Sequence, residues 1–225
     1  MKQVRVFYYL FVLNMTLAFL VYFLLPDYRH YLIMEDSLIE NIGAFLFLTT
    51  SMLAFIFFIK NQKNRITFII ISALGALAFL DEISFGKRII GYDSPSINNK
   101  TIDSGHDMID VFISSIKSTI STTQILILVV VLISFTMPLL YKYRTNIHLT
   151  FKKHKNNPIA LMLFSFFLLV GCALLIDLEL LQTSLFNLVM LEELLEMNAA
   201  AAFLFLFFSV YHENKRADHL KQPAL

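Results

Sequence analysis

Long apolar stretches alternate with short polar connections along the whole of this 225-residue chain. A helix rises about 1.5 Å per residue and the hydrocarbon core of a bilayer is about 30 Å thick, so about twenty apolar residues are needed to cross it. Five stretches approach that length, at about 6–25, 41–59, 124–141, 158–176 and 192–211. The pattern predicts membrane-spanning helices.

A sixth apolar stretch, 66–80, is shorter than the others. Fifteen helical residues cover only about 23 Å. We therefore expect the helix to continue through Asp81, Glu82 and Ser84, which would bring carboxylates to the membrane interface or below it. The predicted fold is all-α: a polytopic transmembrane bundle of about six spans over 1–212, followed by a polar cytoplasmic tail at 213–225.

Two segments between the predicted spans are not simple connections. Residues 86–106 contain several Gly, Asn and Pro residues and are predicted to form an ordered polar loop. Residues 107–120 carry apolar side chains along one side of a predicted helix. That helix could lie on the membrane surface or extend the next span, and the sequence leaves both open.

Charged residues are strongly segregated between alternate connections. Thirteen of the 18 Lys and Arg residues fall at the N-terminus, in 60–65, in 142–155 and in the tail, whereas 15 of the 17 acidic residues fall on the opposite side. Because connections rich in Lys and Arg remain in the cytoplasm, we predict that both termini are cytoplasmic. Acidic residues contribute little to this rule, so their segregation points to a function at the outer face.

Composition narrows the class further. Hydrophobic residues make up 57% of the chain and charged residues 16%, which excludes an ordinary soluble domain. The single cysteine, Cys172, lies in an apolar stretch and excludes an intramolecular disulfide. No phosphate-binding glycine loop and no nucleic-acid-binding module is present.

Three acidic clusters lie at the predicted outer ends of spans: Glu35, Asp36 and Glu40; Asp81 and Glu82; and Glu192, Glu193 and Glu196. Residues four apart share a helix face at about 5–6 Å, so the pairs within the first and third clusters repel unless a proton or a cation intervenes. A purely structural explanation remains open, because acids stabilise helix N-termini on solvated faces. Three clusters at one end of a small bundle favour a functional site.

Other polar residues near these clusters suggest roles in chemistry. Glu82, His106, Arg88 and Ser84 are the candidate catalytic residues. The candidate metal ligands are Asp36, Glu40, Asp81, Glu192, Glu193 and Glu196. No His- and Cys-rich zinc pattern occurs, so a carboxylate site would suit Mg²⁺, Mn²⁺ or Ca²⁺ better.

The segment from Asp81 to Pro95 reads D-E-I-S-F-G-K-R-I-I-G-Y-D-S-P. It resembles a motif, E-E-I-S-W-G-Q-R-x-x-G-[FW]-x-[TS]-P, of a family of bacterial polytopic membrane proteins that is itself uncharacterised. This family also has an N-x-H-[ND] segment, an early E-D-x-x-x-E and a late E-E-x-x-E. The resemblance implies a bacterial inner-membrane location and places the matching residues in one site. The chain departs from the motif at Asp81, Phe85, Lys87 and Gly105.

Two functions from different classes remain open at this point. The first is an outward-facing, cation-dependent hydrolase or transferase that acts on a lipid or a lipid-linked substrate. The second is a non-catalytic membrane subunit or sensor that binds a divalent cation or a partner protein through its acidic face. A carrier is disfavoured, because no acid falls at mid-membrane in the predicted spans.

Overall fold

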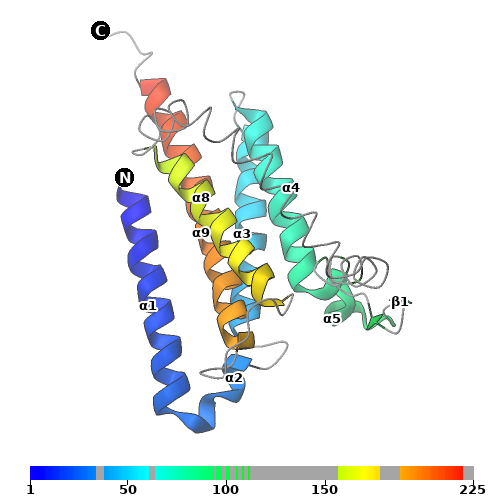
Figure 1. Cartoon of the computed structure of the whole chain (residues 1–225). Helices are drawn as coiled ribbons and strands as arrows, with labels where there is room; N and C mark the ends of the chain where they lie inside the picture. The colour runs from blue at the N-terminus through cyan, green and yellow to red at the C-terminus, as the bar shows by residue number, and fades with distance from the viewer. Residues whose placement is uncertain are drawn as a thin grey trace, which may run out of the picture.

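The computed structural model describes residues 1–33, 38–60, 64–93, 95–97, 100–101, 105, 108, 111, 157–177 and 188–219 (Figure 1). The predicted fourth span, at 124–141, and nearly all of segment 107–120 lie outside these residues.

Five long helices form the described bundle: α1 (Lys2–Leu24), α3 (Leu38–Lys60), α4 (Arg65–Glu82), α8 (Pro158–Asp177) and α9 (Leu188–His219). The shorter elements are η1 (Pro26–Tyr28), α2 (His30–Ile33), η2 (Ser84–Gly86), α5 (Lys87–Ile90) and a hairpin of β1 (Ser96–Ile97) and β2 (Lys100–Thr101). Four of the long helices, α1, α3, α8 and α9, are long and apolar enough to cross a membrane. The predicted helical architecture is therefore confirmed for this part of the chain, with four helices that could span a membrane.

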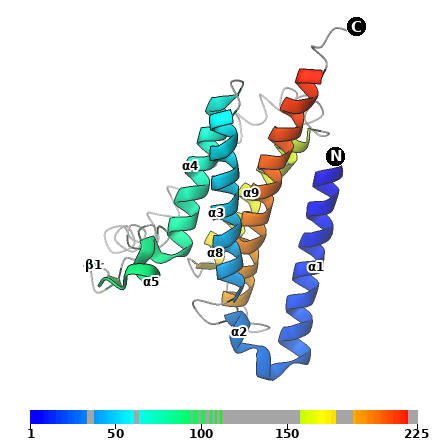
Figure 2. The same cartoon turned by 180° about the vertical axis from the view of Figure 1, so that it is seen from behind.

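Helix α9 is the central element of the described bundle. It contacts α8, α3 and α1, and the two opposite views show it between α3 and α8 (Figures 1 and 2). Ala199, Ala200 and Ala202 are fully buried along it. Small side chains let helix backbones approach closely, which is a principal source of helix association in lipid.

Helices α3 and α4 pack closely along their length. The Ser51 hydroxyl on α3 donates a hydrogen bond to the Ser72 carbonyl oxygen on α4 at 2.8 Å. One turn further along α4, a Cβ on Gly75 would lie 3.1 Å from the Phe47 carbonyl oxygen and 3.2 Å from the Ser51 backbone nitrogen. Only glycine allows this separation without a shift of one helix.

Helix α1 is attached to the bundle more sparsely. Most of its side chains are exposed, and only Val4, Phe7 and Ala18 are buried. Side-chain hydrogen bonds to described residues help to anchor it. Asn14 Nδ2 donates to Asn198 Oδ1 on α9 at 3.2 Å, and the hydroxyls of Tyr8 and Ser165 on α8 lie 3.0 Å apart. Asn198 is fully buried, so the first bond lies inside the apolar part of the protein.

The end of α4 differs from the prediction. The helix includes Asp81 and Glu82, as expected, but it does not continue through Ser84. Ser84 and Phe85 have φ angles of 52° and 49°, in the left-handed region that side chains with a Cβ seldom adopt, and the chain turns away from the helix axis. The described residues of the following segment contain α5 and the hairpin.

The last helix is longer than predicted at both ends. It begins at Leu188, four residues before the predicted start, and it continues to His219. Part of the segment predicted as a polar tail therefore extends α9.

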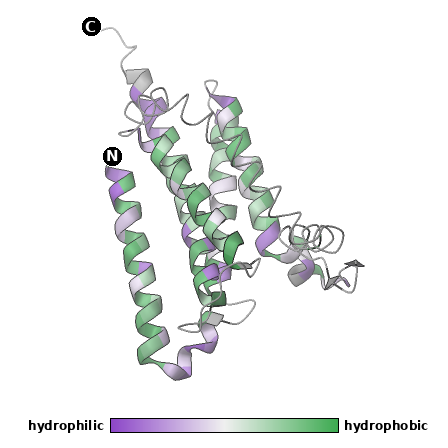
Figure 3. Cartoon of the chain, viewed as in Figure 1, coloured by the Kyte–Doolittle hydropathy of each residue, from purple (hydrophilic) through white to green (hydrophobic). Residues whose placement is uncertain are grey.

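Polar residues gather at two opposite ends of the bundle (Figure 3). One end, here called the basic end, holds the start of α1, the end of α3, the start of α4 and the end of α9, with Lys2, Lys60 and Lys215. The acidic end holds the start of α3, the end of α4 and the start of α9, with Glu40, Glu82 and the α9 acids. For these described residues, the charge segregation of the sequence thus corresponds to two ends of the bundle.

Candidate functional site

Glu82, the last residue of α4, lies where three helices meet at the acidic end. A Cβ built on Gly43 of α3 would lie 3.7 Å from each carboxylate oxygen of Glu82 and 3.6 Å from the Cα of Met197 on α9. The absence of a side chain at Gly43 leaves the space that the carboxylate occupies. Gly43 and Glu82 are about forty positions apart in the sequence, and Met197 follows more than one hundred positions later. The three residues are nevertheless neighbours in the structure.

The acids of α9 lie on the same side of the bundle as Glu82. Glu192, Glu193 and Glu196 occupy the first two and a half turns of the helix, and all three are partly buried. The carboxylates of Glu82, Glu193, Glu192 and Asp81 lie close enough to Glu196 to repel its negative charge. The structure thus brings predicted site residues of α4 and α9 within electrostatic range of one another.

Glu40 belongs to the same end through α3. It is partly buried and precedes Gly43 by three residues, which puts both on one face of the helix. Helix α3, which carries Glu40 in its first turn, is in contact with α9, which carries Glu192, Glu193 and Glu196.

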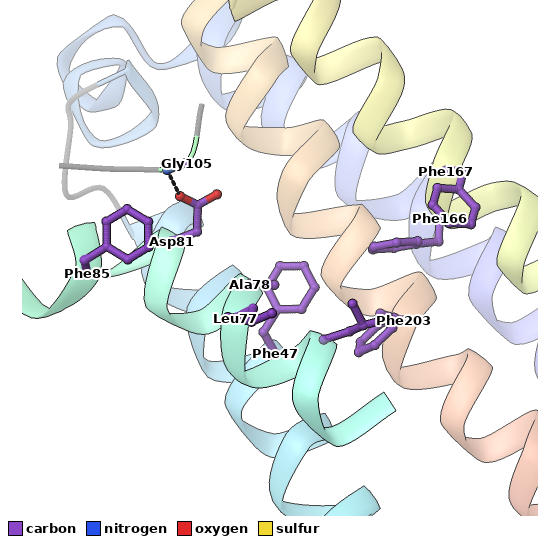
Figure 4. Close-up of a pocket in the computed structure, with 10 residues that line it drawn as sticks. Phe47, Leu77, Ala78, Asp81, Phe85, Gly105, Phe166, Phe167 and Phe203 are labelled. Carbon is purple, nitrogen blue, oxygen red and sulfur yellow. Dashed lines mark hydrogen bonds between the residues drawn. The ribbon is translucent and has the colours of Figure 1, made fainter. Parts of the chain in front are cut away.

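Asp81 has a different role from Glu82, although the two are adjacent in sequence. Its carboxylate accepts a hydrogen bond from the backbone N–H of Gly105 (Figure 4). A Cβ on Gly105 would lie 3.1 Å from Asp81 Oδ1, so the close approach depends on glycine. This contact fixes the position of the residue that directly precedes His106.

The remaining candidate catalytic residues are described only in part. Ser84 is partly buried, and its backbone carbonyl oxygen accepts a hydrogen bond from the Tyr92 hydroxyl at 3.3 Å. The backbone of Arg88 lies in α5, but its side chain is outside the described residues. His106 and Asp36 also lie outside them.

The predicted metal set can be examined only for the ligands that are described. Among the described residues, no group of three or more His, Cys, Asp and Glu side chains is arranged so as to hold a metal ion. Asp36, one of the predicted ligands, is not among them. A divalent cation therefore stays a prediction.

An apolar pocket that the sequence did not predict lies next to Asp81 (Figure 4). Its volume is about 450 Å³, and the described residues that line it come from α3, α4, η2, α8, α9 and the Gly105 position. Five of them are phenylalanines: Phe47, Phe85, Phe166, Phe167 and Phe203. Asp81 and Gly105 contribute the polar atoms. The chain has 23 phenylalanines, so composition alone could not distinguish those of the pocket from those facing lipid.

Comparison of the chain with protein-family models, curated proteins and solved structures found no match. The resemblance to the bacterial membrane family stays a prediction.

Proposed function

We propose that the chain is a bacterial inner-membrane protein of six spans with both termini in the cytoplasm. Asp81 and Gly105 lie at the acidic end of the bundle, whereas α8 begins at the basic end (Figure 1). One further crossing between Gly105 and α8 would account for these opposite positions. The Lys and Arg residues of the basic end support its cytoplasmic assignment.

The acidic end would then be an outward-facing catalytic site. We propose hydrolysis or group transfer on a lipid or a lipid-linked substrate, with Glu82 as general base. The observation that carries this proposal is the position of the Glu82 carboxylate against Gly43 and Met197, within electrostatic range of Glu196. Carboxylates are costly near the membrane, and those that helices gather in one place commonly serve a function.

The neighbouring pocket favours an enzyme over the second candidate, a non-catalytic subunit or sensor. An acidic surface that only binds a cation or a partner protein needs no apolar cavity beside it. Ligand sites, by contrast, are largely apolar cavities of about 300–1,000 Å³ with a few polar groups, and this pocket falls in that range. In the proposed enzyme, His106 transfers a proton and Arg88 holds a phosphate or carboxylate group of the substrate.

The test is the substitution Glu82→Gln, which retains the size of the side chain and removes its charge. Lipid extracts of cells that express the wild type should differ from those of cells without the protein, and Glu82→Gln should abolish that difference. Glu213→Gln is the matched control, because Glu213 is an exposed acid at the opposite end. A Glu82→Gln protein that expresses normally and changes the lipids as the wild type does would contradict the proposal.

The proposed requirement for a divalent cation has its own test. A cation that binds the folded protein raises its melting temperature as its concentration rises above the dissociation constant. We expect Mg²⁺, Mn²⁺ or Ca²⁺ to raise the melting temperature of the detergent-purified protein, and a Glu192→Gln, Glu196→Gln variant to lose the effect. An equal shift in both proteins, or none in the wild type, would exclude a cation at these carboxylates.

A further inference from the structure

The phenylalanine-lined pocket has one closed side and one side that faces outward from the bundle. Phe203 and Phe47 at its inner wall are only 2% and 5% exposed. Leu77 on α4 and Phe167 on α8, at its outer edge, are 60% and 63% exposed. The pocket is therefore closed by Phe47 and Phe203 and open beside Leu77 and Phe167.

The size of the pocket indicates what fits inside it. A helix with its side chains is about 10–12 Å across and rises 5.4 Å per turn, so roughly one turn would fill 450 Å³. A membrane-spanning helix therefore does not fit inside the pocket. A single hydrocarbon chain is narrow enough to extend along it.

The charge at one end of the pocket indicates the chemistry of the head group. Asp81 is the only charged residue among the described residues of the lining, and Glu82 is its neighbour in sequence. One Asp81 oxygen accepts the Gly105 N–H, and the group is partly exposed. A negatively charged end repels an anionic head group and attracts an ammonium group, which can also donate hydrogen bonds to a carboxylate.

We propose that this pocket binds one acyl chain of an ammonium-bearing lipid, such as an ethanolamine phospholipid, with its head group at Asp81. The proposal rests on the proposed function, because it names the substrate class of the same site. The chain would lie against Phe47 and Phe203, and the head group would be presented to Glu82.

The experiment uses the full chain reconstituted in vesicles that contain an ethanolamine phospholipid with a photoreactive diazirine in one acyl chain. After irradiation, tandem mass spectrometry locates the labelled residues. We expect label at the buried Phe47 and Phe203 as well as at exposed residues such as Leu17 on α1, which is 51% exposed. If only exposed residues carry the label, and neither Phe47 nor Phe203 does, the proposal is overturned.

Filling the pocket supplies the matched comparison. Ala78 lines the pocket, whereas Ala73, on the same helix, is exposed and does not. Ala78→Phe should lose the label at Phe203, and Ala73→Phe should keep it. Equal labelling of Phe203 in these two variants would contradict a chain in the pocket. If Ala78→Phe does not fold, the wild-type label at Phe47 and Phe203 still decides the question.

The head group is tested with a phosphatidylglycerol probe that carries the same acyl chain. We expect weaker labelling of Phe203 than with the ethanolamine probe, and equal labelling would overturn the role of Asp81.

Glu82→Gln separates this inference from the catalytic one, because it should keep the label and lose the lipid change. Label without any lipid change in the wild type would contradict only catalysis. A Glu82-dependent lipid change without buried label would contradict only the pocket.

Discussion

At the scale of single residues, the proposed site depends on the absence of a large side chain at position 43. Gly43 leaves room for the Glu82 carboxylate and lies against Met197. The sequence predicted Glu82, Glu192, Glu193 and Glu196 as candidates from their position at the ends of apolar stretches. It could not identify Gly43, because a helical glycine in an apolar stretch has the same appearance whether it faces lipid, another helix or a carboxylate.

A small and a large side chain at position 43 should therefore have different effects on activity and stability. A methyl group at 3.6–3.7 Å is in ordinary contact, so we expect Gly43→Ala to fold and to retain the lipid change. Gly43→Leu should displace the Glu82 carboxylate, abolish the lipid change and destabilise the protein by about 1–3 kcal/mol through overpacking.

Gly171 on α8 provides the control for this prediction. A Cβ there would meet no atom within 4 Å, so Gly171→Leu should be tolerated. Melting temperature and lipid extracts measure the two effects. Gly43→Leu behaving like Gly171→Leu would contradict the position assigned to Glu82.

At the scale of helices, hydropathy predicted most of the bundle and missed its irregular ends. The predicted spans at 41–59 and 158–176 correspond closely to α3 and α8. The turn after Glu82 was missed because the left-handed conformations of Ser84 and Phe85 are set by the folded loop and not by a residue type that favours them. The extension of α9 to His219 was missed because helices continue into water beyond the apolar stretch that reveals them.

Substitution by alanine should have opposite effects on stability at Gly75, which lies in the contact between α3 and α4, and at Gly171 of α8, which does not. Glycine within a helix costs about 0.5–1 kcal/mol relative to alanine. Gly171→Ala should therefore raise the melting temperature in detergent. Gly75→Ala should lower it by an amount equivalent to about 1 kcal/mol, because backbone atoms of Phe47 and Ser51 at 3.1–3.2 Å cannot move aside without shifting the helix. A stabilising effect at both positions would contradict the α3–α4 packing.

The attachment of α1 predicts a measurable coupling between two asparagines. Hydrogen bonds between membrane helices contribute about 0.6 to 2 kcal/mol. We expect Asn14→Leu and Asn198→Leu each to lower the free energy of unfolding, and the double variant to lose less than their sum. Unfolding in a denaturing detergent measures all four proteins of the cycle. Strict additivity would show that Asn14 and Asn198 do not interact.

At the scale of the whole molecule, the charge pattern predicted two distinct ends, and the helices place the described charges accordingly. The pocket could not be predicted from the sequence. Leu77 facing outward and Phe203 facing the pocket are equally apolar, so hydropathy gives them the same assignment, and only the arrangement of four helices distinguishes them. Carboxylate sites, in contrast, are predictable in a membrane protein because charged residues are rare there and stand out.

The most direct test of the account is whether α3 and α9 meet at the Glu82 carboxylate. In a Cys172→Ser background, Gly43→Cys and Met197→Cys should form a disulfide on mild oxidation, because a Cβ at position 43 would lie 3.6 Å from the Met197 Cα. The oxidised protein should then resist a maleimide-coupled polymer until it is reduced. The control pair, Gly171→Cys with Met197→Cys, should stay reactive. Equal reactivity of the two pairs would show that the helices do not meet there, and the proposed site would not exist.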